Sequence, residues 1–308
     1  MWKVLVIGIM LVFLLALAGT SAATTQPMGG AFETTPKDLP VMKLPDDMSG
    51  GPTTPTGNPY GVPPGQDKKP KPDDGSEANK WAVVIGISNY RAGDSLWNPA
   101  NDAKEMKQAL IDNYGFPENN IKLLLDRKAT ARAIDKAIDW LAKSEDADSS
   151  VVFFFSGHGY RAADADKWDS DDEVDGYDEL IVTYDNYGLP DGWLKGKLST
   201  LESLKITLAF GSCHSGGMFD DPDDLQGEGR VIAAACKADE YGWDYLQLRN
   251  TLWGYYFVDE GLLQGLADLN GDGVSIQEAH AYAYAGVTSV RDDSHPQISD
   301  QYFDELIP

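Results

Sequence analysis

The sequence predicts an α/β domain with a mostly parallel central sheet flanked by helices. Short apolar runs alternate with segments of helical spacing, and two of these runs, within 153–159 and 208–217, end in small residues and a reactive side chain. A short apolar run bounded by glycine is typical of a buried strand in a parallel sheet. The alternation of strand and helix indicates βαβ units with right-handed crossovers.

The expected elements follow one another from residue 81 onward. Strands are predicted at 81–87, 120–125, 151–156, 179–183, 206–210 and 230–236. Helices are predicted at 101–113 with Asn101 and Asp102 as caps, from a Thr130 cap to Leu141, and at 198–204, 252–266 and 276–290. We therefore expect one folded domain at 81–308, a length that suits a single large α/β unit.

The first 80 residues have a different composition. Residues 1–23 combine a basic start, an apolar stretch and a small-residue cleavage site, which is typical of a secretory signal peptide. The alternative is an uncleaved membrane anchor through residues 4–19, although this stretch is short for a bilayer span. Residues 24–80 are rich in Pro, Gly, Thr and Asp, and we expect a disordered tether or pro-segment there. The chain is expected to be secreted or extracellular, with membrane contact only if the leader is uncleaved.

The chain is strongly acidic, with 308 residues, a formal charge of −24 and a pI of about 4.3. Such a charge argues against nucleic-acid binding, because the phosphate backbone would be repelled. Solubility or adaptation to salt explains an excess of carboxylates, and so does the binding of hard divalent cations.

Two side chains are expected to meet at the carboxyl ends of neighbouring strands, where open α/β sheets place their active sites. Cys213 follows one predicted strand and His158 follows another. His214 points away from Cys213 because adjacent side chains alternate, His280 lies within a predicted helix, and His295 lies in a polar loop. A thiol needs a nearby base to react at neutral pH. The amides of Gly159 and Cys213 are candidates to hold the oxyanion of a tetrahedral intermediate.

The chain resembles the caspase–haemoglobinase superfamily of cysteine peptidases, most closely its metacaspase-like branch. The resemblance covers most of 81–235 and is carried by 84–90, 101–103, 155–159, 175–179 and 212–216. It implies a caspase-like three-layer sandwich, with His158 as general base and acid and Cys213 as the acyl-forming nucleophile. The chemistry needs no cofactor. The expected partner is a protein or peptide substrate, and self-processing after Lys68, Lys69, Lys71 or Lys80 is a further expectation.

The resemblance also bears on the P1 residue, whose side chain enters the substrate pocket. Metacaspases usually carry an acid two residues before the nucleophile, where this chain has Gly211. Asp102 matches the other pocket acid, and we place Ser156 and Gly211 at the same pocket. A single carboxylate favours a basic P1 residue by charge complementarity. Residues 215–219 resemble the legumain branch instead, which implies cleavage after Asn.

Two acidic segments are candidate calcium sites. One is the loop 164–178, which resembles the calcium-binding loop of calcium-activated metacaspases and offers Asp169, Asp171, Asp172 and Glu173. The other is an EF-hand-like loop at 268–278, with expected ligands Asp268, Asn270, Asp272, Val274 and Glu278. Its glutamate stands one residue earlier than an EF-hand requires. A solvated acidic loop and an Asn-Gly-Asp-Gly turn are the respective alternatives.

Other interpretations of the chain remain open. Cys213 and Cys236 are its only cysteines, and in an oxidising compartment a disulfide between them would silence the thiol. The alternative is a free nucleophile at 213 and a small buried residue at 236. A thiol hydrolase of other esters or amides, and a catalytically silent calcium-binding surface module, are the competing functions.

Overall fold

A six-stranded sheet forms the centre of the computed structural model, which describes residues 42–43, 79–163, 174–222 and 224–308. The strand order is β12-β9-β8-β4-β2-β3. The bounds are β2 Lys80–Gly86, β3 Ile121–Leu125, β4 Ser150–Ser156, β8 Ile206–Gly211, β9 Arg230–Ala234 and β12 Gln297–Asp300. Every pairing is parallel except that of β12, which runs antiparallel to β9. The expected mostly parallel sheet is confirmed.

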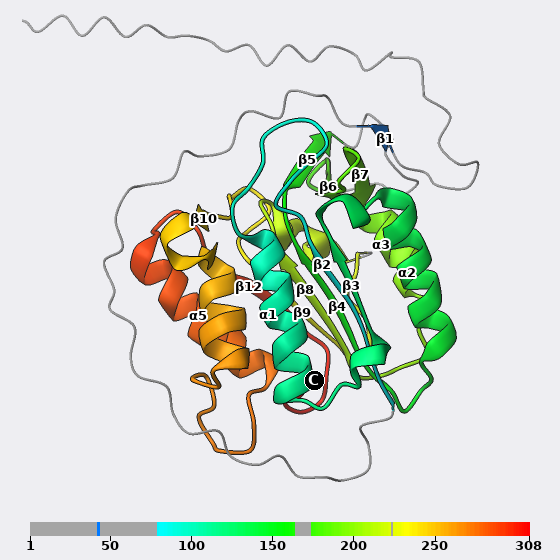
Figure 1. Ribbon diagram of the computed structural model, residues 1–308, viewed down its shortest axis with the longest axis vertical. Helices are drawn as coiled ribbons and strands as arrows, with labels where there is room; N and C mark the ends of the chain where they lie inside the picture. The colour runs from blue at the N-terminus through cyan, green and yellow to red at the C-terminus, as the bar shows by residue number, and fades with distance from the viewer. Residues whose placement is uncertain (1–41, 44–78, 164–173, 223) are drawn as a thin grey trace, which may run out of the picture. The chain divides into compact units, whose positions relative to one another are not determined.

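Helices cover both faces of this sheet (Figure 1). Alternate residues of β2 enter two different apolar clusters, because successive strand side chains point to opposite faces. Helices α2 (Ala131–Ser144) and α3 (Asp191–Leu198) pack on one face. Helix α1 (Pro99–Asp112), α4 (Leu252–Gly254) with the π-helical segment Tyr255–Leu263, and α5 (Ile276–Val290) pack on the other.

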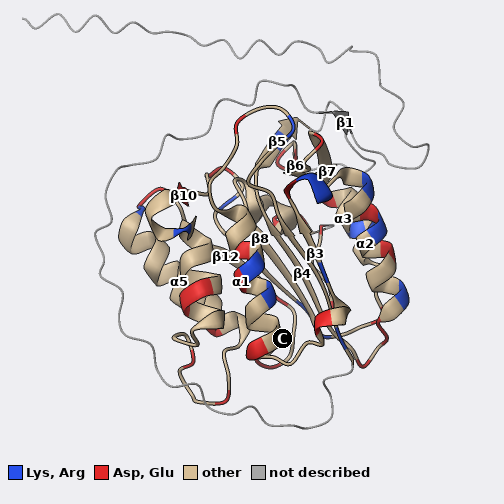
Figure 2. Cartoon of the chain, viewed as in Figure 1, with Lys and Arg blue, Asp and Glu red and all other residues tan. Residues whose placement is uncertain are grey.

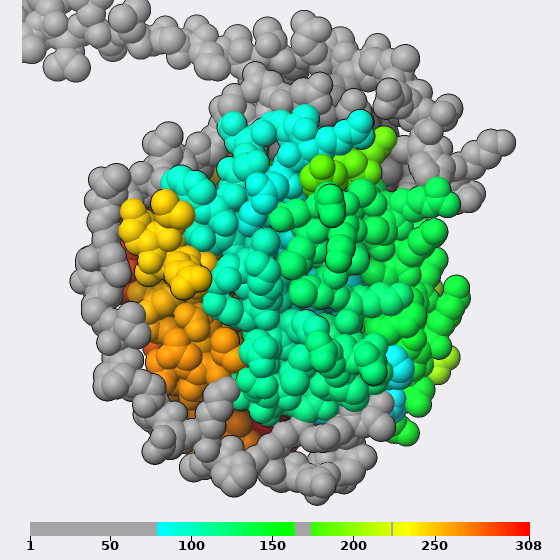
Figure 3. Space-filling model, viewed as in Figure 1, coloured from blue at the N-terminus to red at the C-terminus, as the bar shows by residue number. Residues whose placement is uncertain are grey.

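The strands of the central sheet are therefore apolar on both faces, and the charged residues lie mainly in the helices and loops (Figure 2). Figure 3 shows that α1 lies side by side with the helical segment that follows residue 250. A sheet buried on both faces needs continuous apolar strands, which is the pattern found in β4 and β8.

A smaller antiparallel sheet begins where β4 ends. Its order is β1-β7-β6-β5, with β1 Met42–Lys43, β5 Gly159–Ala163, β6 Tyr177–Val182 and β7 Tyr187–Pro190. A further ladder pairs β10 (Asp244–Tyr245) with β11 (Asn250–Thr251). Strand β6 was expected, whereas β1 lies within the expected tether. Most of the leader and tether lies outside the described residues.

Some predicted elements were wrong or shifted. No helix forms at 198–204: α3 ends at Leu198, and its two glycines weakened the helical pattern upstream. Helix α1 begins at Pro99 after an Asn98 cap rather than at residue 101. Thr130 caps α2 as expected, accepting a hydrogen bond from the Ala133 amide at 3.2 Å. Among the described residues, no helix combines the length and hydrophobicity needed to cross a bilayer.

A buried carboxylate ties α1 to the carboxyl end of the sheet. Asp102 is fully buried. Its Oδ2 accepts the hydroxyls of Ser156 at 2.7 Å and Thr251 at 2.8 Å, and its Oδ1 accepts the Asn250 side-chain amide and the Thr251 amide, both at 3.1 Å. Burial raises the pKa of Asp102 to about 7, although these four donors act to lower it.

We predict that Asp102→Asn removes a pH-dependent part of the stability. Because the folded-state pKa of Asp102 lies above its unfolded value, folding takes up a proton between about pH 4 and pH 7. The unfolding free energy of the wild type therefore rises as the pH falls through this window, by at most about 4 kcal/mol. An Asn side chain does not titrate, so the unfolding free energy of Asp102→Asn lacks this increase. The Asn amide can donate to the Ser156 and Thr251 hydroxyls, which are able to act as acceptors instead.

Denaturant unfolding of the wild type and Asp102→Asn at several pH values measures the difference between their unfolding free energies. Contributions from groups that titrate identically in both proteins cancel in this difference. Asp102→Ala is the comparison: it also lacks the titrating group, but it leaves buried donors unpaired, so it should be about 1–3 kcal/mol less stable than Asp102→Asn at every pH. A stability difference between wild type and Asp102→Asn that stays constant from pH 4 to pH 8 contradicts the prediction.

Candidate active site

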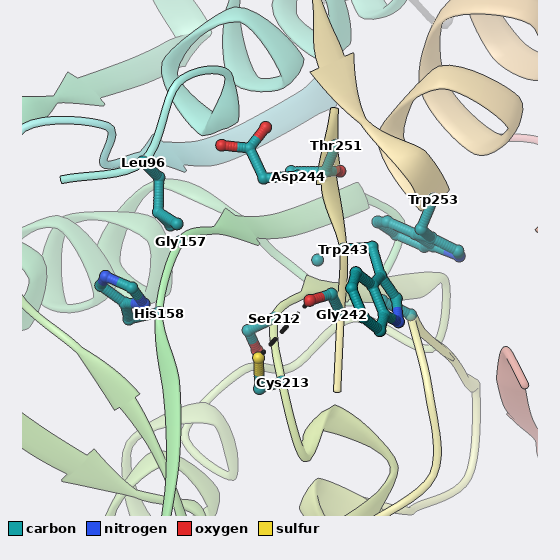
Figure 4. Close-up of a pocket in the computed structure, with 12 residues that line it drawn as sticks. Leu96, Gly157, His158, Ser212, Cys213, Gly242, Trp243, Asp244, Thr251 and Trp253 are labelled. Carbon is teal, nitrogen blue, oxygen red and sulfur yellow. Dashed lines mark hydrogen bonds between the residues drawn. The ribbon is translucent and has the colours of Figure 1, made fainter. Parts of the chain in front are cut away.

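His158 and Cys213 lie past the ends of two neighbouring parallel strands. Strands β4 and β8 are paired so that Ser156 stands opposite Gly211. His158 follows Ser156 by two residues and Cys213 follows Gly211 by two, so both side chains leave the sheet at the same edge. Both line one small pocket of about 40 Å³ (Figure 4). The pairing that was expected from sequence thus brings the imidazole and the thiol to one pocket.

His158 is held by two contacts. Its Nε2 lies 2.8 Å from the carbonyl oxygen of Asp94. A carbonyl only accepts hydrogen bonds, so Nε2 carries the ring proton and Nδ1 is left as the basic atom. The backbone amide of His158 donates to the Tyr90 hydroxyl at 2.7 Å, and the two rings lie 4.7 Å apart. Burial lowers the pKa of His158, and the Asp94 carbonyl only partly offsets this effect.

Cys213 is partly exposed and carries a free thiol. Its Sγ lies 3.7 Å from the carbonyl oxygen of Gly242 (Figure 4). Burial raises the pKa of the thiol to about 11. The structure records no hydrogen bond between the side chains of Cys213 and His158, which have these separate backbone partners. Catalytic hydrogen bonds are often long or absent before substrate binds.

Glycine at position 159 is required by a close approach of two chain segments. A Cβ atom placed at Gly159 would lie 2.0 Å from the carbonyl oxygen of Cys213. Strand β5 therefore begins directly against the backbone of residue 213. This contact brings Gly159, one of the two expected oxyanion donors, beside Cys213. The amide of Cys213, the other expected donor, donates to no backbone carbonyl in the described part of the chain.

The remaining histidines have other partners. His214 is in the left-handed conformation, with φ of 59°, and its Nδ1 lies 2.7 Å from the Ala238 carbonyl oxygen. His295 pairs with Glu240 at 2.7 Å, and His280 contacts the Tyr284 ring. Cys236 is fully buried and free, so the structure contains no bond between the two cysteines.

The expected substrate residues are only partly at the pocket. Gly211 lines it, but Asp102 and Ser156 are fully buried and hydrogen-bonded to each other behind it. The expectation that Asp102 contacts a P1 side chain is therefore corrected: its carboxylate is occupied by four internal donors. Sequence reasoning had placed Asp102 by resemblance alone, and the resemblance did not show how deeply it is buried.

One whole wall of the pocket was missed. It comes from a segment that begins after Cys236 and contains Gly242, Trp243, Asp244, Thr251 and Trp253. Most of this segment has no hydrophobic period, and its short ladder β10–β11 contains only two residues in each strand. The role of the Asp94 carbonyl was also missed, because a backbone acceptor leaves no trace in residue type.

The expected calcium ligands are partly described. Asp268, Asp272 and Glu278 each place a carboxylate oxygen within 4.8 Å of the others. The carbonyl of Val274 accepts the Tyr114 hydroxyl at 3.1 Å, and Asn270 Oδ1 accepts the Asp272 amide at 3.1 Å. The four acidic ligands expected in the other loop, Asp169, Asp171, Asp172 and Glu173, lie outside the described residues.

Comparisons with known proteins agree with this geometry. The family model described as metacaspase, peptidase C14 domain, matches residues 80–222. Metacaspase-1 of Candida albicans is 36% identical over 155 residues, which are 46% of this chain and 34% of the relative. Metacaspase-4 of Arabidopsis thaliana is 33% identical over 155 residues, 48% of this chain and 36% of the relative. The matched region thus spans little more than a third of these relatives.

Solved structures share the fold at low sequence identity. Protein GSU0716 from Geobacter sulfurreducens superposes with a TM-score of 0.57 and 17% identity, over 74% of this chain and 95% of that one. Caspase-1 from Spodoptera frugiperda superposes with a TM-score of 0.50 and 12% identity, over 75% of this chain and 90% of that one. The fold is therefore caspase-like, and residues 80–222 are similar to the metacaspase peptidase C14 domain.

Proposed function

We propose that the protein is a cysteine endopeptidase that uses Cys213 as nucleophile and His158 as general base and acid. The observation that carries this proposal is the shared pocket at the ends of β4 and β8, to which the two side chains are delivered by the register of Ser156 and Gly211. The family of its relatives supports the same chemistry.

The arrangement suggests a sequence of proton transfers. Nδ1 of His158 takes the proton from the Cys213 thiol, and the thiolate attacks the scissile carbonyl carbon. The amides of Gly159 and Cys213 stabilise the oxyanion that forms. The imidazolium then protonates the leaving amine as the C–N bond breaks, and a water activated by His158 hydrolyses the thioester. The Asp94 carbonyl holds the ring throughout by accepting the Nε2 proton.

The proposed substrates are proteins or peptides with a basic P1 residue. No lysine or arginine is among the residues that line the described pocket, and the chain carries a formal charge of −24. Both features favour a cationic side chain by charge complementarity. Cleavage after Asn is the competing specificity, and a panel of peptides that differ only at P1 separates the two.

We also propose export and self-processing. The leader at 1–23 and the tether at 24–80 support export, and lysines in the tether are suitable cleavage points for a basic-P1 enzyme. Lys80 is not a suitable point: it is the first residue of β2, pairs with Ser150, and donates to the carbonyls of Tyr114 and Pro308. The proposal is therefore limited to Lys68, Lys69 and Lys71.

The dyad is tested by substitution. We predict that the exported protein hydrolyses a peptide with Arg at P1, and that Cys213→Ala and His158→Ala each lower kcat by at least about 1000-fold, because both groups act in the chemical step. Hydrolysis is measured with a fluorogenic peptide, and circular dichroism checks that both variants are folded. Full activity in either variant contradicts the proposed mechanism.

The same pair of proteins tests export and processing. N-terminal sequencing of the secreted Cys213→Ala protein should begin near Thr24, whereas the wild type should begin after Lys68, Lys69 or Lys71. Identical N-termini in the two proteins exclude self-processing, and a retained Met1 excludes cleavage of the leader.

The reactivity of Cys213 toward alkylating agents is predicted to depend steeply on pH. Burial raises the thiol pKa to about 11 and lowers the imidazole pKa, so both groups are neutral at pH 7 in the free protein. Because the thiolate is the reactive form, the rate of alkylation by iodoacetamide should rise about tenfold per pH unit between pH 7 and pH 9. Mass spectrometry of the Cys213 peptide measures this rate. A rate that is constant across this range would mean a thiolate–imidazolium pair at rest.

A calcium site at 268–278 is a further part of the proposal. Three carboxylates converge there, and oxygen ligands of this kind suit Ca²⁺. Glu278 is partly committed, since its two oxygens accept the amides of Leu269 and Ser275, both at 3.0 Å. The Ser275 hydroxyl also donates to Oε2 at 3.1 Å, so Oε1 is the oxygen with a second lone pair left for a cation. Bound Ca²⁺ would supply charge compensation to this acidic loop and would take no part in the cleavage step.

We predict that Ca²⁺ raises the melting temperature. At 100 times its Kd, a ligand that binds only the folded state adds about 2.7 kcal/mol, which corresponds to roughly 5 °C or more for a domain of this size. Differential scanning fluorimetry with millimolar Ca²⁺ against EDTA measures the shift. Asp272→Asn should reduce it, whereas Asp292→Asn, which removes an exposed charge outside the cluster, should not. No shift in the wild type rules out the site.

A further inference from the structure

We propose that Asp244 is the residue that selects the P1 side chain, and that it favours arginine over lysine. This inference rests on the proposed peptidase function and names the group that recognises its substrate. It starts from the wall of the pocket that the sequence did not reveal.

Asp244 is the only acidic side chain among the residues that line the described pocket. It lies on the short strand β10, and Figure 4 draws it above His158 and Cys213, between Leu96 and Thr251. Leu96, Trp243 and Trp253 provide apolar surface in the same pocket. A long side chain with an apolar stem and a cationic end matches such a site, because the stem contacts the apolar walls while the charge reaches the carboxylate.

Gly211 and Asp102, the two positions considered for a pocket acid, offer no carboxylate to the P1 side chain in this structure. Gly211 has no side chain, and a Cβ atom placed there would lie 3.2 Å from Cε3 of Trp253, so the indole occupies the space into which a larger residue would project. Asp102 is fully buried, accepts four internal hydrogen bonds, and does not line the pocket. Recognition of a cation in this pocket therefore falls to Asp244.

The carboxylate of Asp244 is oriented by its neighbours. Its Oδ2 accepts the Trp97 amide, and its Oδ1 accepts the Asn98 side-chain amide at 2.7 Å. The backbone amide of Asn98 also hydrogen-bonds to this carboxylate, so three donors fix its orientation, while its two oxygens together offer about four lone pairs. Two parallel acceptors fit the fork of a guanidinium, which binds carboxylates in a bidentate manner, better than the point charge of an ammonium. A planar carboxylate held in one orientation therefore favours arginine over lysine.

Asp244 also lacks a cationic partner within the described part of the chain. The described ion pairs do not include it, and burial raises the pKa of its carboxyl group. A partly buried carboxylate without a counter-ion is costly, and a bound guanidinium would compensate its charge. The present volume of about 40 Å³ holds only one or a few water molecules. Arginine therefore enters only if side chains of the walls turn aside, a common change on binding.

The experiment compares kcat/KM for peptides that differ only at P1, with Arg, Lys, Asn or Ala, in the full-length protein with Ca²⁺ present. The wild type should prefer Arg over Lys, and both strongly over Ala. Asp244→Asn should lower kcat/KM for the Arg peptide on the order of 100-fold, with most of the loss in KM. Asp244→Glu keeps the charge but moves it, so part of the basic preference should remain while the Arg-to-Lys ratio falls. Asp239→Asn, which removes an exposed charge from the same loop outside the pocket, should leave the Arg-to-Ala ratio unchanged.

The outcomes separate this inference from the proposed function. If the wild type cleaves after Arg but Asp244→Asn retains the wild-type Arg-to-Ala ratio, Asp244 is not the selecting residue and the peptidase assignment stands. Cleavage by the wild type without a basic preference overturns the inference in the same way, whereas no cleavage of any peptide overturns both.

Binding provides a second readout in case Asp244→Asn is poorly folded. In a Cys213→Ala background, calorimetry compares a peptide with Arg at P1 with the same peptide carrying citrulline, which has a similar shape and no charge. Tighter binding of the Arg peptide, reduced by the additional change Asp244→Glu, supports the inference. Equal affinity for the two peptides overturns it.

Discussion

The parallel pairing of β4 with β8 is the constraint on which the site depends. Both strands are almost entirely buried because helices cover both faces of the sheet. Their register places Ser156 opposite Gly211 and so brings the two chain ends to the same level. A slip of one residue would move one functional side chain by about 3.3 Å and reverse its face. The apolar core therefore also sets the geometry of His158 and Cys213.

A second constraint concerns how the pocket wall is built. Asp102 is used internally, where it joins α1 to β4 and to the segment after β10 through Ser156, Asn250 and Thr251. The indole of Trp253 lies against Gly211, so the wall that faces the thiol is aromatic at this point. The carboxylate of Asp244 lines the pocket instead, and its donors, Trp97 and Asn98, come from the loop before α1. The acidic side chain at the pocket therefore comes from the short strand β10 and not from the central sheet, so it requires no charged residue in the apolar core.

The parts of the structure that sequence reasoning predicted are those determined by local pattern. The strands that precede His158 and Cys213 are continuous apolar runs, and the helix predicted at 276–290 has those bounds in the structure, where a Ser275 capping box begins it. The predicted helix at 198–204 was wrong because the glycines of α3 concealed its position upstream. The Asp94 carbonyl and the wall at 242–253 depend on tertiary contacts between distant segments. No periodicity or residue type marks such contacts beforehand.

The surroundings of His158 and Cys213 have a consequence for the reactivity of the thiol. A buried imidazole has a lowered pKa and a buried thiol a raised one, so the free enzyme holds a neutral pair rather than a thiolate. Oxidation and disulfide exchange both require the thiolate, and Cys236, the second thiol of the chain, is fully buried with a pKa that is raised further. In the proposed mechanism, the same desolvation that protects Cys213 at rest would make proton transfer to His158 depend on a bound substrate. In this arrangement, reactivity is coupled to occupation of the pocket that Asp244 lines.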